Sequence, residues 1–361
     1  MQRLIVTSAG RGSRTRSRRQ LAALVGVLAS AALLGNAAAA EDPKTRYVPD
    51  KPVITVPLTQ EGWVGDLSLG SSVALSQSSN VVGRIDGTSF AVGLKVNGAL
   101  DWTRDVHEWR NSLTLGETFT RTPAVDQFVK TNDQLLLESI YLYHLRRLPW
   151  LGPFARFKLT TALFPGEDVR AAPVSYVGAV TRTADTLRLT DALTPTTLQE
   201  MLGVFGKPLD RKDLALELKA GFEARQMIAD GQLALADDAA TPEVEVVALQ
   251  HVVQGGPSLG LIAKGQLSEG RVLYAGLAEA MIPAINNQAS GDDRSTLELT
   301  NVNLELNLSF KLVSWASVDY QLRAVREPQL IDKWQLQNNL LLSFSYALIE
   351  RPAPPATKPA S

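Results

Sequence analysis

Cysteine is absent from the 361 residues of the chain, and its absence excludes two kinds of architecture. Neither a disulfide framework nor a thiolate metal site can form without it. Secreted soluble domains often use disulfides, whereas a closed β-barrel completes its own hydrogen-bond ladder and needs none. The missing cysteines therefore favour a barrel slightly, if the chain is exported.

Long apolar runs are almost as scarce, and the clearest one lies near the N-terminus. It extends over 21–34 and is followed by the small-residue tract 37–40. The residues before it include six arginines and no acidic residue: Arg3, Arg11, Arg14, Arg16, Arg18 and Arg19. A basic segment, an apolar segment and an A-x-A end at Ala38 and Ala40 are the three parts of a secretory signal peptide. We expect 1–40 to be this signal peptide, with cleavage after Ala40.

Two other interpretations of the N-terminus are weaker. A transmembrane helix needs about 20 apolar residues, and the run of 21–34 is shorter than that. Ser17-Arg18-Arg19 is compatible with twin-arginine export, but a barrel must cross the inner membrane unfolded, which that route does not favour. After Ala40 no apolar run approaches 18 residues, so we expect no transmembrane helix in the mature chain.

The charge balance argues against a nucleic-acid partner. Six of the 36 basic residues and none of the 37 acidic residues lie in 1–40. The mature chain therefore has 30 basic and 37 acidic residues, a formal charge of −7. A nucleic-acid-binding surface would need a basic face.

From Trp63 onward the dominant hydrophobic period is two, which is typical of strands with two different faces. The segment 302–311 alternates Val, Leu and Phe with Asn, Glu, Ser and Lys, and 88–103 behaves similarly. In a barrel the polar face points into the lumen, where charges lie in water or in an ion-pair network. The charges expected to face inward are Lys95, Asp101, Glu305, Lys311, Asp319 and Arg323.

About twelve such segments are present, many of them longer than the 5–6 residues of ordinary strands and close to the 9–11 of a membrane-spanning strand. They are 63–76, 88–103, 106–121, 131–146, 153–164, 213–228, 243–254, 257–268, 270–283, 296–311, 313–326 and 336–349. The segment 243–254 fits least well. The sequence thus predicts an all-β fold: a transmembrane, antiparallel, up-and-down β-barrel of about twelve strands, within a range of ten to fourteen.

The domain limits follow from these segments. Signal peptide 1–40 precedes an extended periplasmic leader 41–60, the barrel 61–350 and a disordered, proline-rich tail 351–361. Extracellular loops are expected at 121–131, 165–212 and 286–296. Within the second loop, 194–204 has the features of a helix start, with Thr194 or Thr197 as N-cap, and 186–189 could be a strand.

A soluble β-sandwich would also show period-two strands, with the same polar residues on its solvent face. The signal peptide, strand length and hairpin spacing favour the barrel. Six tryptophans also lie near the ends of predicted strands, as interfacial residues of barrels do. They are Trp63, Trp102, Trp109, Trp150, Trp315 and Trp334.

Candidate chemistry is sparse. The three histidines, His107, His144 and His251, have no metal-ligand spacing, and structural or interfacial roles are expected for them. The pairs Asp237-Asp238 and Asp292-Asp293 lie in polar loops and are interpreted as solvated, although a divalent cation could bridge them to lipopolysaccharide. No nucleophile elbow, phosphate loop or dinucleotide fingerprint is present. We assign no catalytic, metal-binding or cofactor-binding residue and expect no cofactor.

Several short motifs resemble a Gram-negative outer-membrane β-barrel family of unknown function (domain of unknown function 3078). They are Trp109-Arg110-Asn111-Ser112-Leu113, Lys130-Thr131-Asn132-Asp133-Gln134-Leu135 before Tyr141 and Tyr143, Val272-Leu273-Tyr274, and Trp334-Gln335-Leu336-Gln337. The resemblance covers roughly 60–349 and implies a barrel with no assigned activity. Lys130 and Asp133 are interpreted as a structural pair where a loop meets a strand.

The sequence therefore predicts a cell outer-membrane barrel that is not an enzyme, with a structural or transport role and a narrow lumen. Expected partners are outer-membrane lipid, lipopolysaccharide and the barrel assembly machinery, which could recognise Phe344 and Tyr346 in the last strand. Two alternatives remain: an outer-membrane hydrolase with an active site at the extracellular rim, and a soluble periplasmic β-protein that binds lipid or a partner. The sequence gives no oligomeric state.

Overall fold

The computed structural model describes residues 61–78, 87–123, 125, 127–229, 231–236, 241–287, 293–329 and 331–349. These residues belong to one compact unit, Arg46–Ser361. The predicted signal peptide, leader and proline-rich tail lie outside the described residues, as do Asp237, Asp238 and Asp292. No helix in these ranges is long and apolar enough to cross a membrane.

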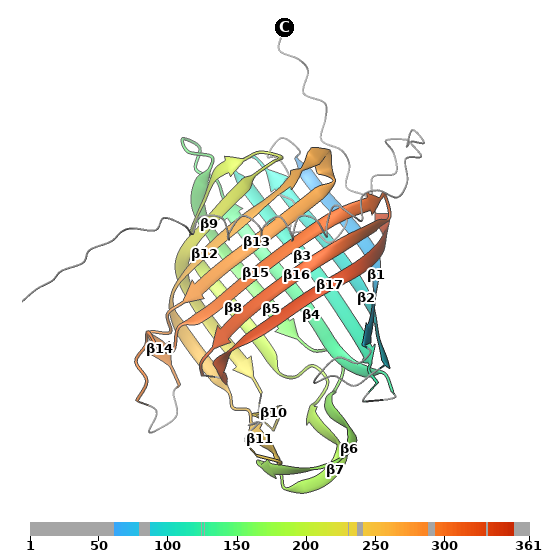
Figure 1. Cartoon of the computed structure of the whole chain (residues 1–361). Helices are drawn as coiled ribbons and strands as arrows, with labels where there is room; N and C mark the ends of the chain where they lie inside the picture. Colours follow the sequence, from blue (N-terminus) through green and yellow to red (C-terminus); the bar gives the residue numbers. More distant parts are fainter. Residues whose placement is uncertain are drawn as a thin grey trace, which may run out of the picture. The chain divides into compact units, whose positions relative to one another are not determined.

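The described residues form a closed barrel of twelve antiparallel strands, which confirms the predicted fold class (Figure 1). The strands are β1 (Gly62–Ser78), β2 (Gly87–Arg104), β3 (His107–Arg121), β4 (Val129–Tyr143), β5 (Leu151–Thr161), β8 (Thr196–Asp210), β9 (Ala215–Ile228), β12 (Val252–Leu267), β13 (Val272–Met281), β15 (Asn301–Val313), β16 (Ala316–Glu327) and β17 (Ile331–Ile349). Pairing of β17 with β1 closes the ring, and the two-residue β14 (Ile285–Asn286) is hydrogen-bonded to β12.

The barrel has two unlike ends. At the end where β1 begins and β17 finishes, strands are joined by short connections such as 105–106, 211–214 and 314–315. We call this the turn end; the 3-10 turn η2 (Ser268–Gly270) lies there. The opposite, loop end has longer connections, 162–195, 229–251 and 282–300.

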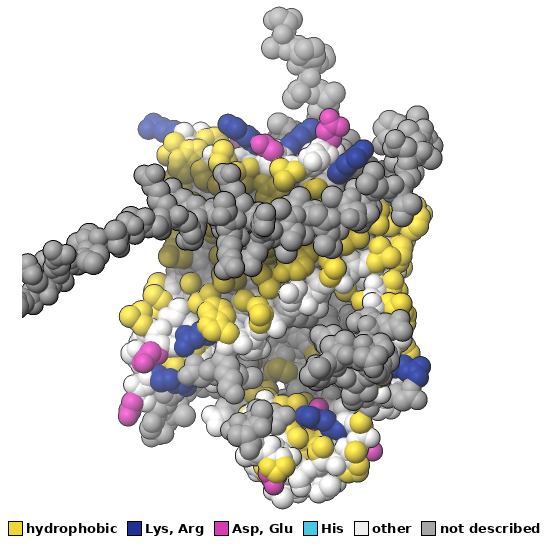
Figure 2. All heavy atoms as spheres, in the orientation of Figure 1, with side chains coloured by type: hydrophobic (Ala, Val, Ile, Leu, Met, Phe, Trp, Pro, Cys, Tyr) yellow, Lys and Arg dark blue, Asp and Glu magenta, His cyan; other side chains and the backbone are white. Residues whose placement is uncertain are grey.

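Alternation of side chains explains why these segments form a barrel with an apolar outside. On β2, Leu94 is 60% exposed and Leu100 is 48% exposed, whereas Asp101, whose side chain faces the lumen, is 2% exposed. On β17, Leu340 and Leu348 face outward in the same way. Hydrophobic side chains gather over the barrel wall, while charged ones gather near its two ends (Figure 2). Such a large exposed apolar surface is suited to lipid and not to water.

Five of the six tryptophans lie at the turn end, as expected for an interfacial girdle. Trp63, Trp102 and Trp109 occupy neighbouring register positions on β1, β2 and β3, and the ring centroid of Trp63 lies 5.9 Å from that of Trp109. Trp150 and Trp315 lie in turn-end connections. Trp334 lies in the half of β17 nearer the loop end.

The predicted number of strands is confirmed, but one predicted strand and part of one predicted loop are wrong. The segment 243–254 is not a barrel strand: Val244–Ala248 forms β11 outside the barrel, and β12 begins only at Val252. The loop predicted over 165–212 is wrong at its C-terminal part, because β8 of the barrel occupies Thr196–Asp210.

The helix predicted over 194–204 is therefore also wrong, and the reason is the side-chain pattern of β8. Its inward-facing Met201 and Phe205 are apolar because they pack in a buried cluster, while Leu202 and Val204 face outward. With apolar residues on both faces, the period of two is hidden. The Thr196 hydroxyl, which lies between the two proposed caps, donates a hydrogen bond to the Leu193 carbonyl and lies 2.9 Å from Thr161 Oγ1.

Two of the loop-end excursions meet in a second sheet. Its strands, in the order β10, β11, β6 and β7, are Leu233–Leu235, Val244–Ala248, Gly166–Gly178 and Arg182–Thr190. β11 pairs in parallel with β6, and Tyr176, Leu187, Val244 and Val246 form a buried core. Burial and the hydrogen bond that Tyr176 donates to Asp168 raise the pKa of the tyrosine. The strand suspected at 186–189 is confirmed as part of β7; it lies outside the barrel and leaves the even count intact.

The apolar outer band can be tested by placing a charge on it. We expect Leu340→Arg, at the middle of β17, to destabilise the folded protein in bilayers by about 2–4 kcal/mol, because the arginine would lie in hydrocarbon. The free energy of unfolding in lipid vesicles measures this. The matched control is Ser345→Arg on the inward face of the same strand, which should have a much smaller effect. Equal losses for both variants would contradict the assignment of the two faces.

Candidate functional site

The lumen is filled asymmetrically. Over 68–74 of β1 and 343–347 of β17 the inward side chains are small and remain partly exposed, while larger inward residues such as Asp66 and Leu341 flank these stretches. We call this set the small-residue wall: Ser68, Gly70, Ser72, Ala74, Ser343, Ser345 and Ala347. In the ring of twelve strands β9 lies six strands from β1, and β8 six from β17, so these strands face the small-residue wall across the lumen. Their inward side chains are mostly large and buried, as with Phe205, Lys219 and Glu223.

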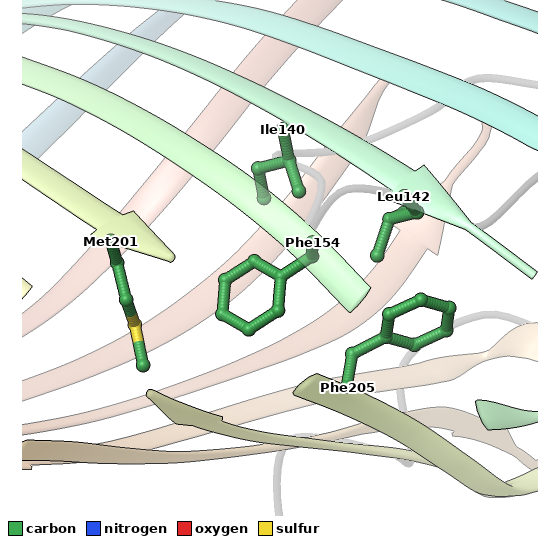
Figure 3. Close-up of a cluster of buried hydrophobic side chains, with 5 residues drawn as sticks. All are labelled: Ile140, Leu142, Phe154, Met201 and Phe205. Atoms are coloured by element: carbon green, nitrogen blue, oxygen red, sulfur yellow. The ribbon is translucent and has the colours of Figure 1, made fainter. Parts of the chain in front are cut away.

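An apolar cluster fills part of the lumen on the β8 side. It comprises Ile140 and Leu142 of β4, Phe154 of β5, and Met201 and Phe205 of β8 (Figure 3). All five side chains are at most 4% exposed. Apolar side chains inside a membrane barrel exclude water, so solute cannot pass through this part of the cross-section.

Glu108, near the turn end of β3, is the centre of a first ion-pair network. Its carboxylate accepts hydrogen bonds from Arg110 Nε at 2.6 Å and from Lys207 Nζ at 2.9 Å, and it lies 2.8 Å from His144 Nε2. Arg110 continues across the lumen to Glu217 on β9 at 3.0 Å, and Glu217 also binds Lys219 at 2.8 Å. The network thus ties β3, β8 and β9 together.

Arg156 of β5 is the centre of a second network nearer the loop end. It donates to Glu279 of β13 and to Glu223 of β9, the latter at 3.3 Å. Glu223 also accepts from Ser258 Oγ at 2.8 Å and from Gln199 Nε2 at 3.1 Å. Because Arg156 and Glu223 are almost fully buried, these contacts replace water as the partners of the charges.

On the loop-end side of the second network lies a polar cavity of about 330 Å³, which we call the mouth cavity. Its charged lining residues are Asp133, Lys158, Glu223, Arg225, Glu279, Arg323 and Glu327. Much of the rest of the lining is polar, for example Gln134, Thr160 and Asn303. Glu223 and Glu279 contribute both to this cavity and to the network of Arg156, so the ion pairs form its floor.

Each of the three histidines contacts a neighbouring group of the protein. His144 is buried between Glu108 and the Pro149 carbonyl, and its Nδ1 lies 2.5 Å from that oxygen. His107 lies on the outside with its Nδ1 2.5 Å from the Tyr141 hydroxyl. His251 lies near the loop end, with its Nδ1 3.2 Å from the Met227 carbonyl. The His144–Glu108 contact is the meeting of histidine and carboxylate that a hydrolase would need, but it is buried at the turn end.

The Lys130–Asp133 pair is confirmed as a structural contact. Lys130 Nζ lies 2.7 Å from Asp133 Oδ2 and also donates to the Phe164 carbonyl. The Asp133 carboxylate accepts the backbone N–H groups of Leu163 and Phe164, both at 2.8 Å. The pair therefore fixes the chain where it leaves β5 for the second sheet.

Part of the inward face could be predicted and part could not. Lys95, Asp101, Glu305, Lys311, Asp319 and Arg323 lie on the expected face: Asp319 accepts from Ser309 Oγ at 2.5 Å, and Arg323 lies 3.7 Å from Glu305. No pattern in the sequence indicates the Glu108 and Arg156 networks, because their members come from strands that are distant in the chain. Among the described residues, no group of three or more His, Asp or Glu could hold a metal ion.

No family model and no curated protein matches this chain, so the resemblance to domain of unknown function 3078 is not confirmed. Solved structures with a similar arrangement are outer-membrane barrels. The translocator domain of the autotransporter NalP from Neisseria meningitidis has 12% identity and a TM-score of 0.33, with 92% of this chain and 96% of that chain covered. An outer-membrane channel from Pseudomonas putida F1 has 12% identity and a TM-score of 0.39, with 83% and 100% covered.

The P. putida toluene transporter TodX has 10% identity and a TM-score of 0.30, with 81% of this chain and 92% of that chain covered. At such scores we infer no function from these likenesses. Twelve antiparallel strands, closed pairing and an apolar outer wall define the class of this protein: it is a β-barrel of the outer-membrane type.

Arg156→Met tests the second network. Removing the guanidinium leaves the carboxylates of Glu223 and Glu279 without their cation, and we expect a loss of about 3–5 kcal/mol in the free energy of unfolding. Urea unfolding of the detergent-solubilised barrel measures it. Arg146→Met is the control, because the Arg146–Asp105 pair is exposed and should contribute less than about 1 kcal/mol. Similar small losses for both variants would show that the network does not stabilise the barrel.

Proposed function

We propose that the protein is an outer-membrane channel for small polar solutes. The observation that carries the proposal is the asymmetric lumen: a polar mouth cavity at the loop end, large buried side chains on β8 and β9, and a small-residue wall on β1 and β17. Partly exposed serines and glycine facing inward are the lining of a water-filled path. The path is narrow, because ion pairs and the apolar cluster occupy the other side of the lumen.

The polar lining indicates the kind of solute. Charged and amide groups surround the mouth cavity, and burying an apolar molecule there would desolvate them without compensation. A hydrophilic solute can instead exchange its hydration shell for these groups. The proposal therefore differs from the transport of toluene named for one of the similar structures.

We also propose the location and the partners. Both ends of the barrel chain, Gly62 and Ile349, lie at the turn end, which in single-chain bacterial barrels faces the periplasm. The loop end and the second sheet would then face outward, beside lipopolysaccharide. Outer-membrane lipid would contact the apolar band. Tyr346 is 71% exposed on the last strand and, with Phe344, is the candidate signal for the barrel assembly machinery.

A non-enzymatic role fits this arrangement best. The hydrolase alternative requires an accessible histidine and carboxylate at the loop-end rim. The His144–Glu108 contact does not supply this, since both side chains are at most 3% exposed and lie at the turn end.

The channel is tested by narrowing the small-residue wall. Ser343 of β17 lies in register with Ser72 of β1 and Ser317 of β16, so Ser343→Trp would place a large ring in the proposed path. We expect its single-channel conductance in planar bilayers to be severalfold below that of the unmodified protein. Leu342→Trp, one residue away on the outward face, is the matched control and should conduct normally.

Two outcomes would contradict the channel. One is an unmodified, folded barrel with no conductance at any voltage. The other is equal conductance of the Ser343→Trp variant and the unmodified protein.

The location is tested by fractionation. We expect the protein in the outer-membrane fraction, extracted only by detergent and migrating differently in gels before and after heating. Recovery in the soluble periplasmic fraction without detergent would overturn both the location and the channel.

A further inference from the structure

We propose that the mouth cavity binds a small hydrophilic carboxylate between Lys158 and Arg323. This inference rests on the proposed channel, because it names the class of solute for that cavity. It follows from which charged groups of the lining already have partners and which do not.

The carboxylates of the lining are engaged. Glu223 and Glu279 bind Arg156, Glu327 lies 2.6 Å from Arg225, and Asp133 binds Lys130 and two backbone N–H groups. A cationic solute would have to displace a protein cation from one of these pairs. Since several of the pairs are buried, breaking them leaves a desolvated charge without a partner.

The cations of the lining are less engaged. Lys158 interacts electrostatically with Glu279 but forms no direct ion pair with any residue that the structure describes. Arg323 forms a long ion pair with Glu305, 3.7 Å from Nε to Oε1, and the arginine side chain is 46% exposed. The Nε of Arg225, which is buried, has no hydrogen-bond acceptor among the described residues. The cavity thus has positive donors available and few free carboxylates.

The strand order places the two cations on opposite sides of the cavity. Lys158 is on β5 and Arg323 is on β16, six strands apart in the ring of twelve. An anion in the cavity would therefore lie between them. Glu138 is the register partner of Lys158 on β4, but it forms no direct ion pair with the lysine, and its charge acts on Arg156.

Other polar groups select for a solute that also carries hydroxyls. The Oδ1 of Asn303 is buried and accepts no hydrogen bond from the residues that the structure describes, so a solute hydroxyl can donate to it. Thr160 and Thr197 add hydroxyls to the lining. A cavity of about 330 Å³ lies near the lower limit of ligand pockets, which suits a small molecule.

Gluconate and sorbitol are suitable probes, since they have similar chains and differ in the carboxylate. We expect calorimetry at low salt, with the full chain in detergent, to show gluconate binding at least about tenfold more tightly than sorbitol. Lys158→Gln and Arg323→Gln should each weaken gluconate binding by about tenfold. Neither side chain is fully buried, so both variants should fold. Arg104→Gln, which removes an exposed positive charge at the turn end, is the control and should bind normally.

Equal binding of gluconate and sorbitol, or normal gluconate binding by both cavity variants, would overturn the carboxylate site. The channel is judged separately by conductance. If the protein conducts but does not bind gluconate, the channel is supported and the carboxylate site is overturned. Specific gluconate binding by a protein without conductance supports the site and overturns the channel.

Discussion

Closure of the hydrogen-bond ladder is the constraint on which the rest of this structure depends. In a bilayer every backbone N–H and C=O must find a partner within the protein, and an open sheet edge would leave a row of them unpaired. Pairing of β17 with β1 removes the last edge, so the backbone groups of these strands are paired and the outer wall can be apolar. The same closure creates an interior that lipid cannot reach, where charged side chains can be placed.

Which charged side chains meet in that interior depends on the positions of their strands in the closed barrel and not on their separation in the sequence. Arg110 meets Glu217 and Arg156 meets Glu279, although each pair is more than a hundred residues apart in the sequence. Such pairs join strands that lie four apart in the ring, at the cost of desolvating their charges. They concentrate on the β8 and β9 side, and the small side chains of β1 and β17 leave space on the other side. This asymmetry makes a narrow polar channel a sensible interpretation of the fold.

Much of the fold could be predicted because alternation is a local property. The alternation from Val302 to Lys311 is enough to predict which side chains face lipid. Strand length distinguishes a membrane barrel from a sandwich. The prediction was wrong at β8, where Met201 and Phe205 fill the lumen and make the inward face apolar. It was also wrong at 243–254, where a short strand of the second sheet and the start of β12 follow each other closely. The mouth cavity had no signal in the sequence, since its lining comes from strands around the whole ring.

The sequence by itself therefore determined the two faces of most strands and the approximate number of strands, because neighbouring residues on a strand must point to opposite sides. Only the tertiary structure decided which inward side chains meet. Lys158 and Arg323 line one cavity because closure of the barrel places β5 opposite β16, and Arg156, not Lys158, makes the direct contact with Glu279. Those relations depend on distances across the lumen, which no local pattern of residues encodes.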